Sequence, residues 1–110
     1  MSYKITVSDE FLKQLKPLAK RYPSIKQDLI TLQDDLIENP IQGDLLGTNL
    51  YKVRLKIRSK NKGKSGGARV VTYVLIEDET IHLVTIYDKS DIENISKTYI
   101  DSILKEEGLL

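Results

Sequence analysis

Hydrophobic and polar residues repeat along this chain with two different periods, and the changes of period mark the elements that we expect. Residues 3–7 and 50–57 alternate with a period of two, which predicts strands with one buried face. Residues 68–76 and 80–87 are almost continuous β-formers, as in central strands covered on both faces. Apolar residues at helical spacing predict three helices, over residues 9–22, 25–38 and 91–107.

Local signals indicate how these helices begin and continue. Ser24 with Gln27 and Ser90 with Glu93 have the spacing of capping boxes, which predicts a helix start directly after each serine. Pro17 lacks a backbone N–H and its ring meets the preceding turn. We therefore expect the first helix to kink at this residue or to divide into two pieces.

The order of elements indicates an α+β fold in a single domain over residues 1–110. Residues 41–49 and 59–67 contain glycines between the predicted elements and are expected to be loops. The resulting order is βααβββα. It describes a small, mostly antiparallel sheet with an N-terminal helical hairpin and a C-terminal helix packed on it.

Composition excludes several classes of function. The chain has no cysteine, so a disulfide, a thiolate nucleophile or a Cys-ligated metal is excluded. Its single histidine, His82, lies within a predicted strand and is expected to be structural. The acidic residues have no recognisable metal-ligand spacing, and we predict no cofactor. No signal peptide and no run of about 18 apolar residues is present, so we expect a cytoplasmic protein without membrane contact.

One segment, residues 51–73, concentrates positive charge. It contains 8 of the 17 Lys and Arg residues and none of the 16 Asp and Glu residues. The basic residues at every second position are Lys52, Arg54, Lys56, Arg58, Lys60, Lys62 and Lys64. Since side chains two apart on a strand point the same way, those up to Arg58 are expected to line one face, with the apolar residues between them packed on the other. Such a face suits a polyanion, most simply a phosphate backbone.

The residues of this segment and its surroundings carry a family resemblance. The matching stretches are the Tyr-Pro-Ser turn at 22–24, YKVRL at 51–55, GARVV at 67–71 and IYDK at 86–89. With the order of elements, they resemble the RelE/ParE toxin superfamily over nearly the whole chain. The lysine-rich stretch 62–69 is most similar to the HigB-type branch. The resemblance implies a toxin of a type II toxin–antitoxin system that enters the ribosomal A site and cuts mRNA.

The resemblance also implies partners and site residues. The partners are a cognate antitoxin of helix-turn-helix type, ribosomal RNA and mRNA. Lys52 and Arg54 match the basic pair that the family has on its second strand, and Arg69 matches the basic residue that opens the next strand. Residues 58–64 are then expected to hold RNA backbone through Arg58, Lys60, Lys62 and Lys64.

Two positions depart from the family pattern. Ser90 stands where the best-known members have a second arginine, and Ser96 stands where they have a tyrosine. Tyr87 and Lys89 are the nearest substitutes for a general acid or a group that stacks on a base.

RNA cleavage by such residues requires a base, a phosphate clamp and an acid. Crowded like charges favour the neutral, proton-accepting form of a lysine, which makes Lys52 or Lys56 the expected base. Arg54 and Arg69 are the expected clamp. Two other functions are compatible with the pattern: a ParE-like toxin of the same fold that acts on DNA gyrase, and a non-catalytic module that binds RNA or the ribosome.

Overall fold

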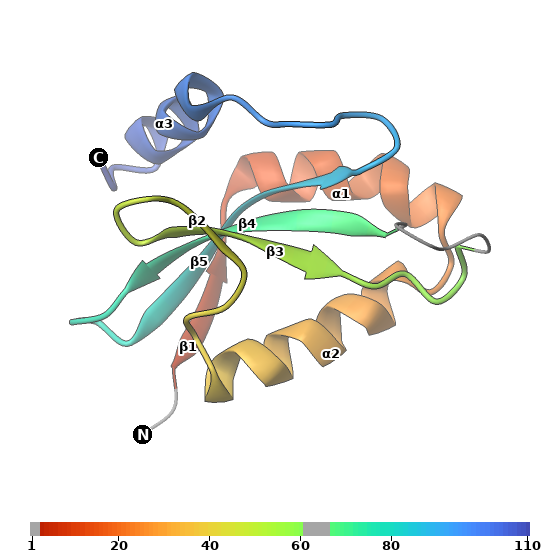
Figure 1. Ribbon diagram of the computed structural model, residues 1–110, viewed down its shortest axis with the longest axis horizontal. Helices are drawn as coiled ribbons and strands as arrows, with labels where there is room; N and C mark the ends of the chain where they lie inside the picture. Colours follow the sequence, from red (N-terminus) through yellow and green to blue (C-terminus); the bar gives the residue numbers. More distant parts are fainter. Residues whose placement is uncertain (1–2, 61–66) are drawn as a thin grey trace.

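The protein forms a five-stranded sheet with helices on both faces (Figure 1), in a computed structural model that describes residues 3–60 and 67–110. The elements in chain order are β1 (Lys4–Val7), α1 (Asp9–Arg21), α2 (Ile25–Glu38), β2 (Asp44–Gly47), β3 (Leu50–Leu55), β4 (Ala68–Leu75), β5 (Thr80–Asp88) and α3 (Lys97–Glu106). The predicted α+β class is confirmed, and the predicted order holds with one additional strand, β2.

The strand order across the sheet is β1-β5-β4-β3-β2. Only β1, the first strand of the chain, runs parallel to its neighbour β5, and the other described pairs are antiparallel. The pairing of β4 with β5 shifts by one residue: Val71 lies opposite Thr85, but Thr72 lies opposite Leu83. Val84 is therefore an extra residue in β5, as in a β-bulge.

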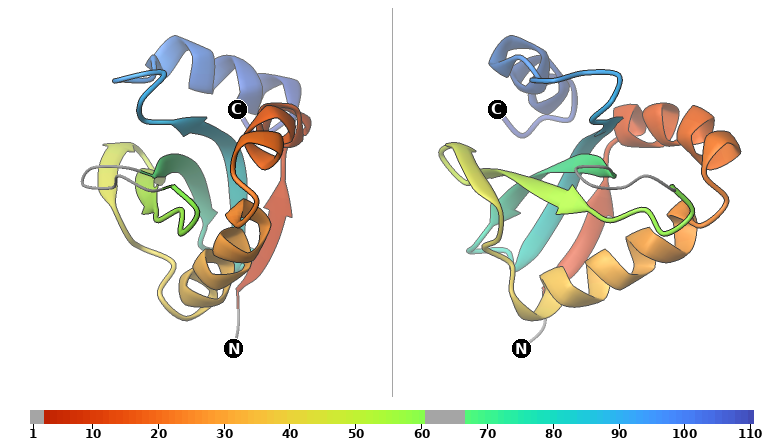
Figure 2. Two further views of the ribbon diagram at one scale, coloured as in Figure 1. Left: turned by 90° about the vertical axis from the view of Figure 1, so that its right-hand side faces the viewer. Right: turned by 45° about the vertical axis from the view of Figure 1, so that its right-hand side comes forward.

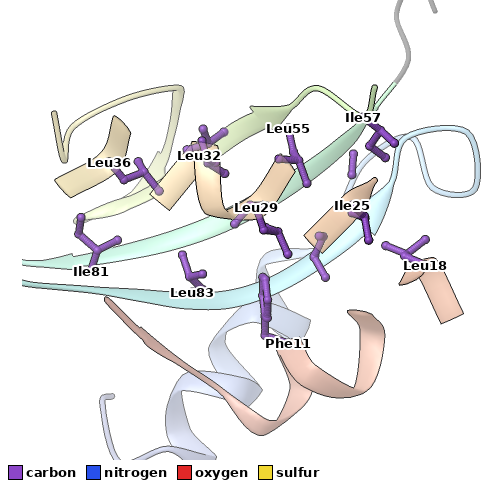
Figure 3. Close-up of a cluster of buried hydrophobic side chains, with 14 residues drawn as sticks. Phe11, Leu18, Ile25, Leu29, Leu32, Leu36, Leu55, Ile57, Ile81 and Leu83 are labelled. Atoms are coloured by element: carbon purple, nitrogen blue, oxygen red, sulfur yellow. The ribbon is translucent and has the colours of Figure 1, made fainter. Parts of the chain in front are cut away.

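Each face of the sheet has its own hydrophobic core. On one face, which we call the hairpin face, α1 and α2 pack against the sheet around Phe11, Leu29 and Leu36. Figure 3 shows side chains of α2 meeting Ile81 and Leu83 of β5 in this cluster. On the other face, the α3 face, the apolar residues of α3 pack against Leu50, Val71 and Val84. Figures 1 and 2 show α2 and α3 on opposite sides of the sheet.

Helix α1 is continuous, so the expected division at Pro17 is not observed. Pro17 is exposed, which leaves the carbonyl that lost its partner accessible to water. Buried Phe11 and Leu18 anchor the helix on either side of the proline. The helix begins at Ser8, whose Oγ accepts a 2.9 Å hydrogen bond from the Phe11 N–H and donates one of 2.6 Å to the Val84 carbonyl.

Neither predicted capping box forms, although α2 begins directly after Ser24 as predicted. Ser24 makes no side-chain capping bond, and its Oγ donates to Asp28 Oδ2 at 2.7 Å. The Ser90 hydroxyl donates to Asp88 Oδ1 at 2.7 Å. Helix α3 begins seven residues after Ser90, at Lys97, with Ser96 as its cap.

The predicted loop at residues 41–49 contains the short strand β2, which extends the sheet beyond β3. Two predicted strands are also slightly long: the strand expected over 50–57 ends at Leu55, and the one expected over 68–76 ends at Leu75. β2 borders only the first half of β3, from Leu50 to Lys52. Among the described residues, no strand pairs with the outer side of the second half of β3, which we call the open edge of β3.

Candidate nucleic-acid interface

Three side chains from separate strands form one row across the sheet. Arg54 of β3 lies opposite Arg69 of β4, which in turn lies opposite Tyr87 of β5. Directly opposite residues of antiparallel strands share a face, with Cβ atoms about 5 Å apart. Val70 and Ile86, which alternate with the row, belong to the core of the hairpin face. Arg54, Arg69 and Tyr87, which we call the cross-strand row, therefore lie on the α3 face.

The positive charge of the cross-strand row has no carboxylate partner in residues 3–60 and 67–110. No Asp or Glu oxygen of this part of the chain lies within 4.0 Å of the charged nitrogens of Arg54 or Arg69. Arg69 is only 7% exposed, and its Nη1 donates to the neighbouring Ala68 carbonyl at 3.1 Å. Opposed like charges destabilise a sheet, so this pair costs stability in the absence of an anion.

Tyr87 closes the row with a buried hydroxyl that has no hydrogen-bond partner among the described residues. Burial raises the pKa of the Tyr87 phenol, and the nearby charge of Arg69 offsets part of that rise. The phenol is therefore protonated at neutral pH. It can donate a hydrogen bond or a proton to a ligand that binds beside Arg69.

Two lysines flank the row on the β3 side. Lys52 lies opposite Val71, two residues before Arg54 and on the same face. Lys56 follows the end of β3 and is exposed. The apolar residues between the basic ones, Val53, Leu55 and Ile57, are all buried in the core of the hairpin face. The predicted alternation along this segment is therefore confirmed.

A groove of about 380 Å³ runs between the open edge of β3 and α2. Arg54, Lys56 and Arg58 line one wall, and Asp28 and Asp35 line the other. Arg58 Nε lies 3.7 Å from Asp28 Oδ1, but the Arg58 side chain is 64% exposed. Its guanidinium thus stays accessible to a polyanion at the surface.

Lys60 is bound within the fold. Its Nζ lies 2.9 Å from Asp88 Oδ1 and 3.2 Å from Ser90 Oγ, and its side chain is 17% exposed. Asp88 alternates with Tyr87 along β5, so this contact lies on the hairpin face, away from the cross-strand row. Lys60 is therefore separated from the cross-strand row.

Lys89 is the remaining predicted site residue in the described part of the chain. Lys89 follows β5 directly, is half-buried, and donates its backbone N–H to the Gly67 carbonyl at 3.3 Å. It lies two residues after Tyr87, next to the start of β4. Lys62 and Lys64 fall outside the described residues.

The sequence did not reveal the network around Asp88. This fully buried carboxylate accepts hydrogen bonds from Arg21 Nη1 at 2.9 Å and from the Tyr22 hydroxyl at 2.5 Å, as well as from Lys60 and Ser90. Burial opposes ionisation of Asp88, but the hydrogen bonds from Tyr22, Ser90 and Lys60 outweigh it and hold the pKa of the carboxyl well below its usual range. The spacing of Asp88 and Ser90, typical of an Asx turn, is the local signal for part of this network.

His82 has the burial and the polar contact expected of a structural histidine. It is buried, and its Nδ1 lies 2.7 Å from Thr6 Oγ1. Its Nε2 lies 3.3 Å from Glu107 Oε1 and has no hydrogen-bond partner among the described residues. Burial lowers the pKa of His82, and Glu107 opposes that shift only in part. His82 lies five residues before Tyr87 on β5, which is roughly 16 Å along a strand.

Two further observations concern metals and membranes. In the described part of the chain, no group of three or more His, Asp and Glu side chains is arranged to hold a metal ion. None of the helices in residues 3–60 and 67–110 has the length and apolar character needed to cross a membrane.

Comparison with known proteins places this arrangement in a family. Residues 11–107 match the family model of the RelE toxin of the RelE/RelB toxin–antitoxin system. A double mutant of the Escherichia coli toxin RelE in the free state has a similar structure, with a TM-score of 0.61, 20% identity, and coverage of 97% of this chain and 98% of that chain. The isolated E. coli RelE toxin in another crystal form matches with a TM-score of 0.61 at 19% identity, over 94% of this chain and 97% of that chain.

The intact E. coli RelBE toxin–antitoxin complex gives a TM-score of 0.60 at 20% identity, over 77% of this chain and 94% of that chain. At these identities the structural matches establish the fold. The family match covers most of the sequence and is independent of them. The chain belongs to the RelE toxin family.

Proposed function

We propose that the chain is a toxin that cuts mRNA on the ribosome and thereby inhibits translation. The observation that carries this proposal is the cross-strand row, in which two arginines without a described carboxylate partner lie beside a buried, protonated phenol. Arginine matches the oxygens of a phosphate in bidentate geometry. The row therefore fits a phosphodiester. Membership of the RelE toxin family supplies the biological setting.

In the proposed reaction, the ribose 2′-oxygen attacks the adjacent phosphorus and the bond from phosphorus to the 5′-oxygen breaks. The products are a 2′,3′-cyclic phosphate and a 5′-hydroxyl. Lys52 or Lys56 takes the proton from the 2′-hydroxyl, and Tyr87 or Lys89 gives one to the leaving 5′-oxygen. Arg54 and Arg69 bind the non-bridging oxygens, whose negative charge grows in the transition state.

RNA on either side of the cut is proposed to run along the basic surface. Arg58 is available because its side chain is mostly exposed. Lys62 and Lys64, outside the described residues, continue the same basic stretch. Lys60 contributes less, because Asp88 and Ser90 hold its ammonium group. Phosphate contacts of this kind release counterions, so binding should weaken steeply with salt.

The proposed partners are a cognate antitoxin, mRNA and ribosomal RNA. The antitoxin follows from the family, which is defined by a toxin–antitoxin system. The lysine-rich stretch that resembles the HigB-type branch favours an antitoxin of helix-turn-helix type.

In vitro translation of a defined mRNA tests the cleavage. Arg69→Ala and Lys52→Ala should each abolish or strongly reduce cutting, whereas Lys26→Ala, which removes an exposed charge from α2, should cut normally. Mapping of the ends should show a 2′,3′-cyclic phosphate. Unchanged cutting by both site variants would refute the assignment.

The same preparation separates the two other functions. Inhibition of gyrase supercoiling with intact mRNA would indicate a ParE-like toxin. Salt-dependent RNA binding with no cut RNA under any condition would indicate a non-catalytic binding module.

A further inference from the structure

A second cavity, of about 380 Å³, lies next to the cross-strand row at the edge of β5. Such a volume is within the range of about 300–1,000 Å³ that small-molecule sites have. Helix α1, the end of β5, the connection at residues 89–96 and the start of α3 enclose it. The residues that matter for its chemistry are Glu10, Gln14, Tyr87, Asn94, Ile95 and Tyr99. We call it the Tyr99 pocket.

The Tyr99 pocket shares Tyr87 with the cross-strand row, so the two sites adjoin. The Tyr87 hydroxyl is buried and has no partner among the described residues, which is costly unless a ligand supplies one. A nucleotide matches two adjoining sites of this kind, because its base is joined to its phosphate through a single ribose. Since Arg69 lies opposite Tyr87, a phosphate on Arg69 would have its neighbouring base within reach of this pocket.

An oriented carboxylate, that of Glu10, also lines the pocket. Glu10 Oε2 accepts hydrogen bonds from the Tyr99 hydroxyl at 2.5 Å and from Gln14 Nε2 at 2.9 Å. These bonds, from Tyr99 first and Gln14 second, lower the pKa of Glu10, so it is ionised at neutral pH. No hydrogen bond from the described residues reaches Oε1, which leaves that oxygen to accept from a ligand.

The other walls suit a flat ring. Ile92 and Ile95 supply aliphatic surface, the rings of Tyr87 and Tyr99 supply aromatic surface, and Asn94 supplies an amide. Bases in single-stranded RNA are recognised in this way, by stacking and by hydrogen bonds to their edges. The Glu10 carboxylate repels a phosphate, so the base is the part of a nucleotide that this pocket accepts.

We propose that the Tyr99 pocket binds one unpaired RNA base that carries an exocyclic amino group, and that Glu10 selects it. The proposal rests on the proposed function, since the base belongs to the RNA held by the cross-strand row. A carboxylate oxygen accepts the amino group of adenine, cytosine or guanine. Uracil has no amino group, and its one donor on the Watson–Crick edge, N3–H, lies between two carbonyl oxygens that the carboxylate repels, so uracil is disfavoured.

Nucleotide titrations followed by NMR test this in ¹⁵N-labelled protein. The probes are the 3′-monophosphates of adenosine, cytidine, guanosine and uridine. The first three should shift the backbone amides of Asn94, Ile95 and Tyr99 and bind about tenfold more tightly than the uridine nucleotide. Glu10→Gln, which keeps the size of the side chain and removes its charge, should abolish that preference. Glu38→Gln, an exposed glutamate at the end of α2, should keep it.

The outcomes separate this proposal from the proposed function. Shifts confined to the amides of Arg54 and Arg69 would overturn the base pocket and leave the phosphate site in place. Equal binding of all four nucleotides, or an unchanged preference in Glu10→Gln, would overturn the role of Glu10. If wild-type protein cuts mRNA during translation while the amides of Asn94, Ile95 and Tyr99 stay unshifted in the titrations, the proposed function stands and the base pocket is refuted.

Discussion

The Asp88 carboxylate at the end of β5 accepts a 2.5 Å hydrogen bond from the Tyr22 hydroxyl, just beyond the end of α1. This contact joins residues 66 positions apart in the sequence. The same carboxylate binds Lys60 and Arg21, so three separate segments meet on one buried charge. Asp88 thereby holds the strand end that carries Tyr87 against the helical hairpin.

Replacement of Asp88 should destabilise the fold strongly. Asp88→Ala removes a fully buried acceptor and leaves the Lys60 ammonium without its partner, a change that typically costs about 3 kcal/mol or more. Urea unfolding of wild type and variant measures the difference. Asp91→Ala removes the exposed second partner of Arg21 and should change the free energy of unfolding by less than about 1 kcal/mol. Equal effects of the two replacements would contradict the assigned role of Asp88.

The pH dependence of stability follows from the same residue. The pKa of Asp88 is lower in the folded protein than its unfolded value of about 3.9, so the unfolded state binds more protons at acid pH. The stabilisation is fully present above about pH 5 and is lost as the pH falls through and below 4. Asp88→Asn should show a shallower loss of stability over this range. If the free energies of unfolding of wild type and Asp88→Asn fall in parallel with decreasing pH, other carboxylates determine the loss of stability in acid.

Removal of the Tyr87 hydroxyl should separate activity from stability. Tyr87→Phe deletes a buried oxygen that has no described partner, so stability should stay constant or rise by about 1 kcal/mol. If Tyr87 is the general acid, cleavage should fall by about 100-fold or more. Tyr99→Phe is the matched control for stability: it removes a hydroxyl bonded to Glu10 and should cost about 1 kcal/mol. A destabilised Tyr87→Phe would imply a partner for this hydroxyl in the fold.

Neutralising Arg69 should lower cleavage activity without lowering the stability of the fold. Arg69→Gln keeps much of the buried stem but removes one of two opposed positive charges, which should leave stability unchanged or raise it by about 0.5 kcal/mol. Cleavage should fall by about 100-fold, because the transition-state charge loses a donor. Arg69→Lys keeps the charge without the bidentate geometry, so its cleavage rate should lie between those of wild type and Arg69→Gln. Thermal unfolding and a single-turnover cleavage assay provide the measurements.

The entry to β4 depends on the backbone of Gly67. This residue has φ +89°, and a Cβ there would lie 2.3 Å from the Leu55 carbonyl oxygen of β3. Gly67→Ala must therefore strain the backbone and push β3 away at Leu55, the residue that follows Arg54. Gly108, with φ +74° and open space around it, is the matched control. Denaturation should show Gly67→Ala to be the less stable of the two by more than about 1 kcal/mol, and equal stabilities would refute the close approach.

Regular local patterns were sufficient to predict most elements and the sheet face of several candidate site residues. The alternation around Arg54 predicted both its strand and its face, because side chains alternate with a period of two in any sheet. β2 was missed because its four residues, from Asp44 to Gly47, show no alternation and are stabilised by pairing with β3. The start of α3 was misplaced because the Asp88 carboxylate accepts both the backbone N–H and the hydroxyl of Ser90, which holds residues 88–90 in a turn.

The assembly of the site depended on contacts that sequence spacing does not encode. Arg54, Arg69 and Tyr87 were each candidates, but their alignment in one row follows from the register of three strands. The bond between Glu10 and Tyr99 spans 89 residues, so neither residue showed any local sign of the other. Glu10 fits equally well as an ordinary acidic residue of a first helical turn.

The extra residue in β5, Val84, affects which insertions and deletions this strand can tolerate. Val84 reverses the alternation of the strand, so that Tyr87 points to the α3 face and Asp88 to the hairpin face. A one-residue deletion at this point would remove the bulge, restore regular alternation and keep Tyr87 opposite Arg69. A one-residue insertion between Val84 and Tyr87 would instead make Tyr87 and Asp88 exchange faces. The α3 face would then carry a carboxylate beside the arginines, and the buried network would receive a phenol in place of its central anion. We therefore expect β5 to tolerate the loss of one residue at the bulge but not the gain of one.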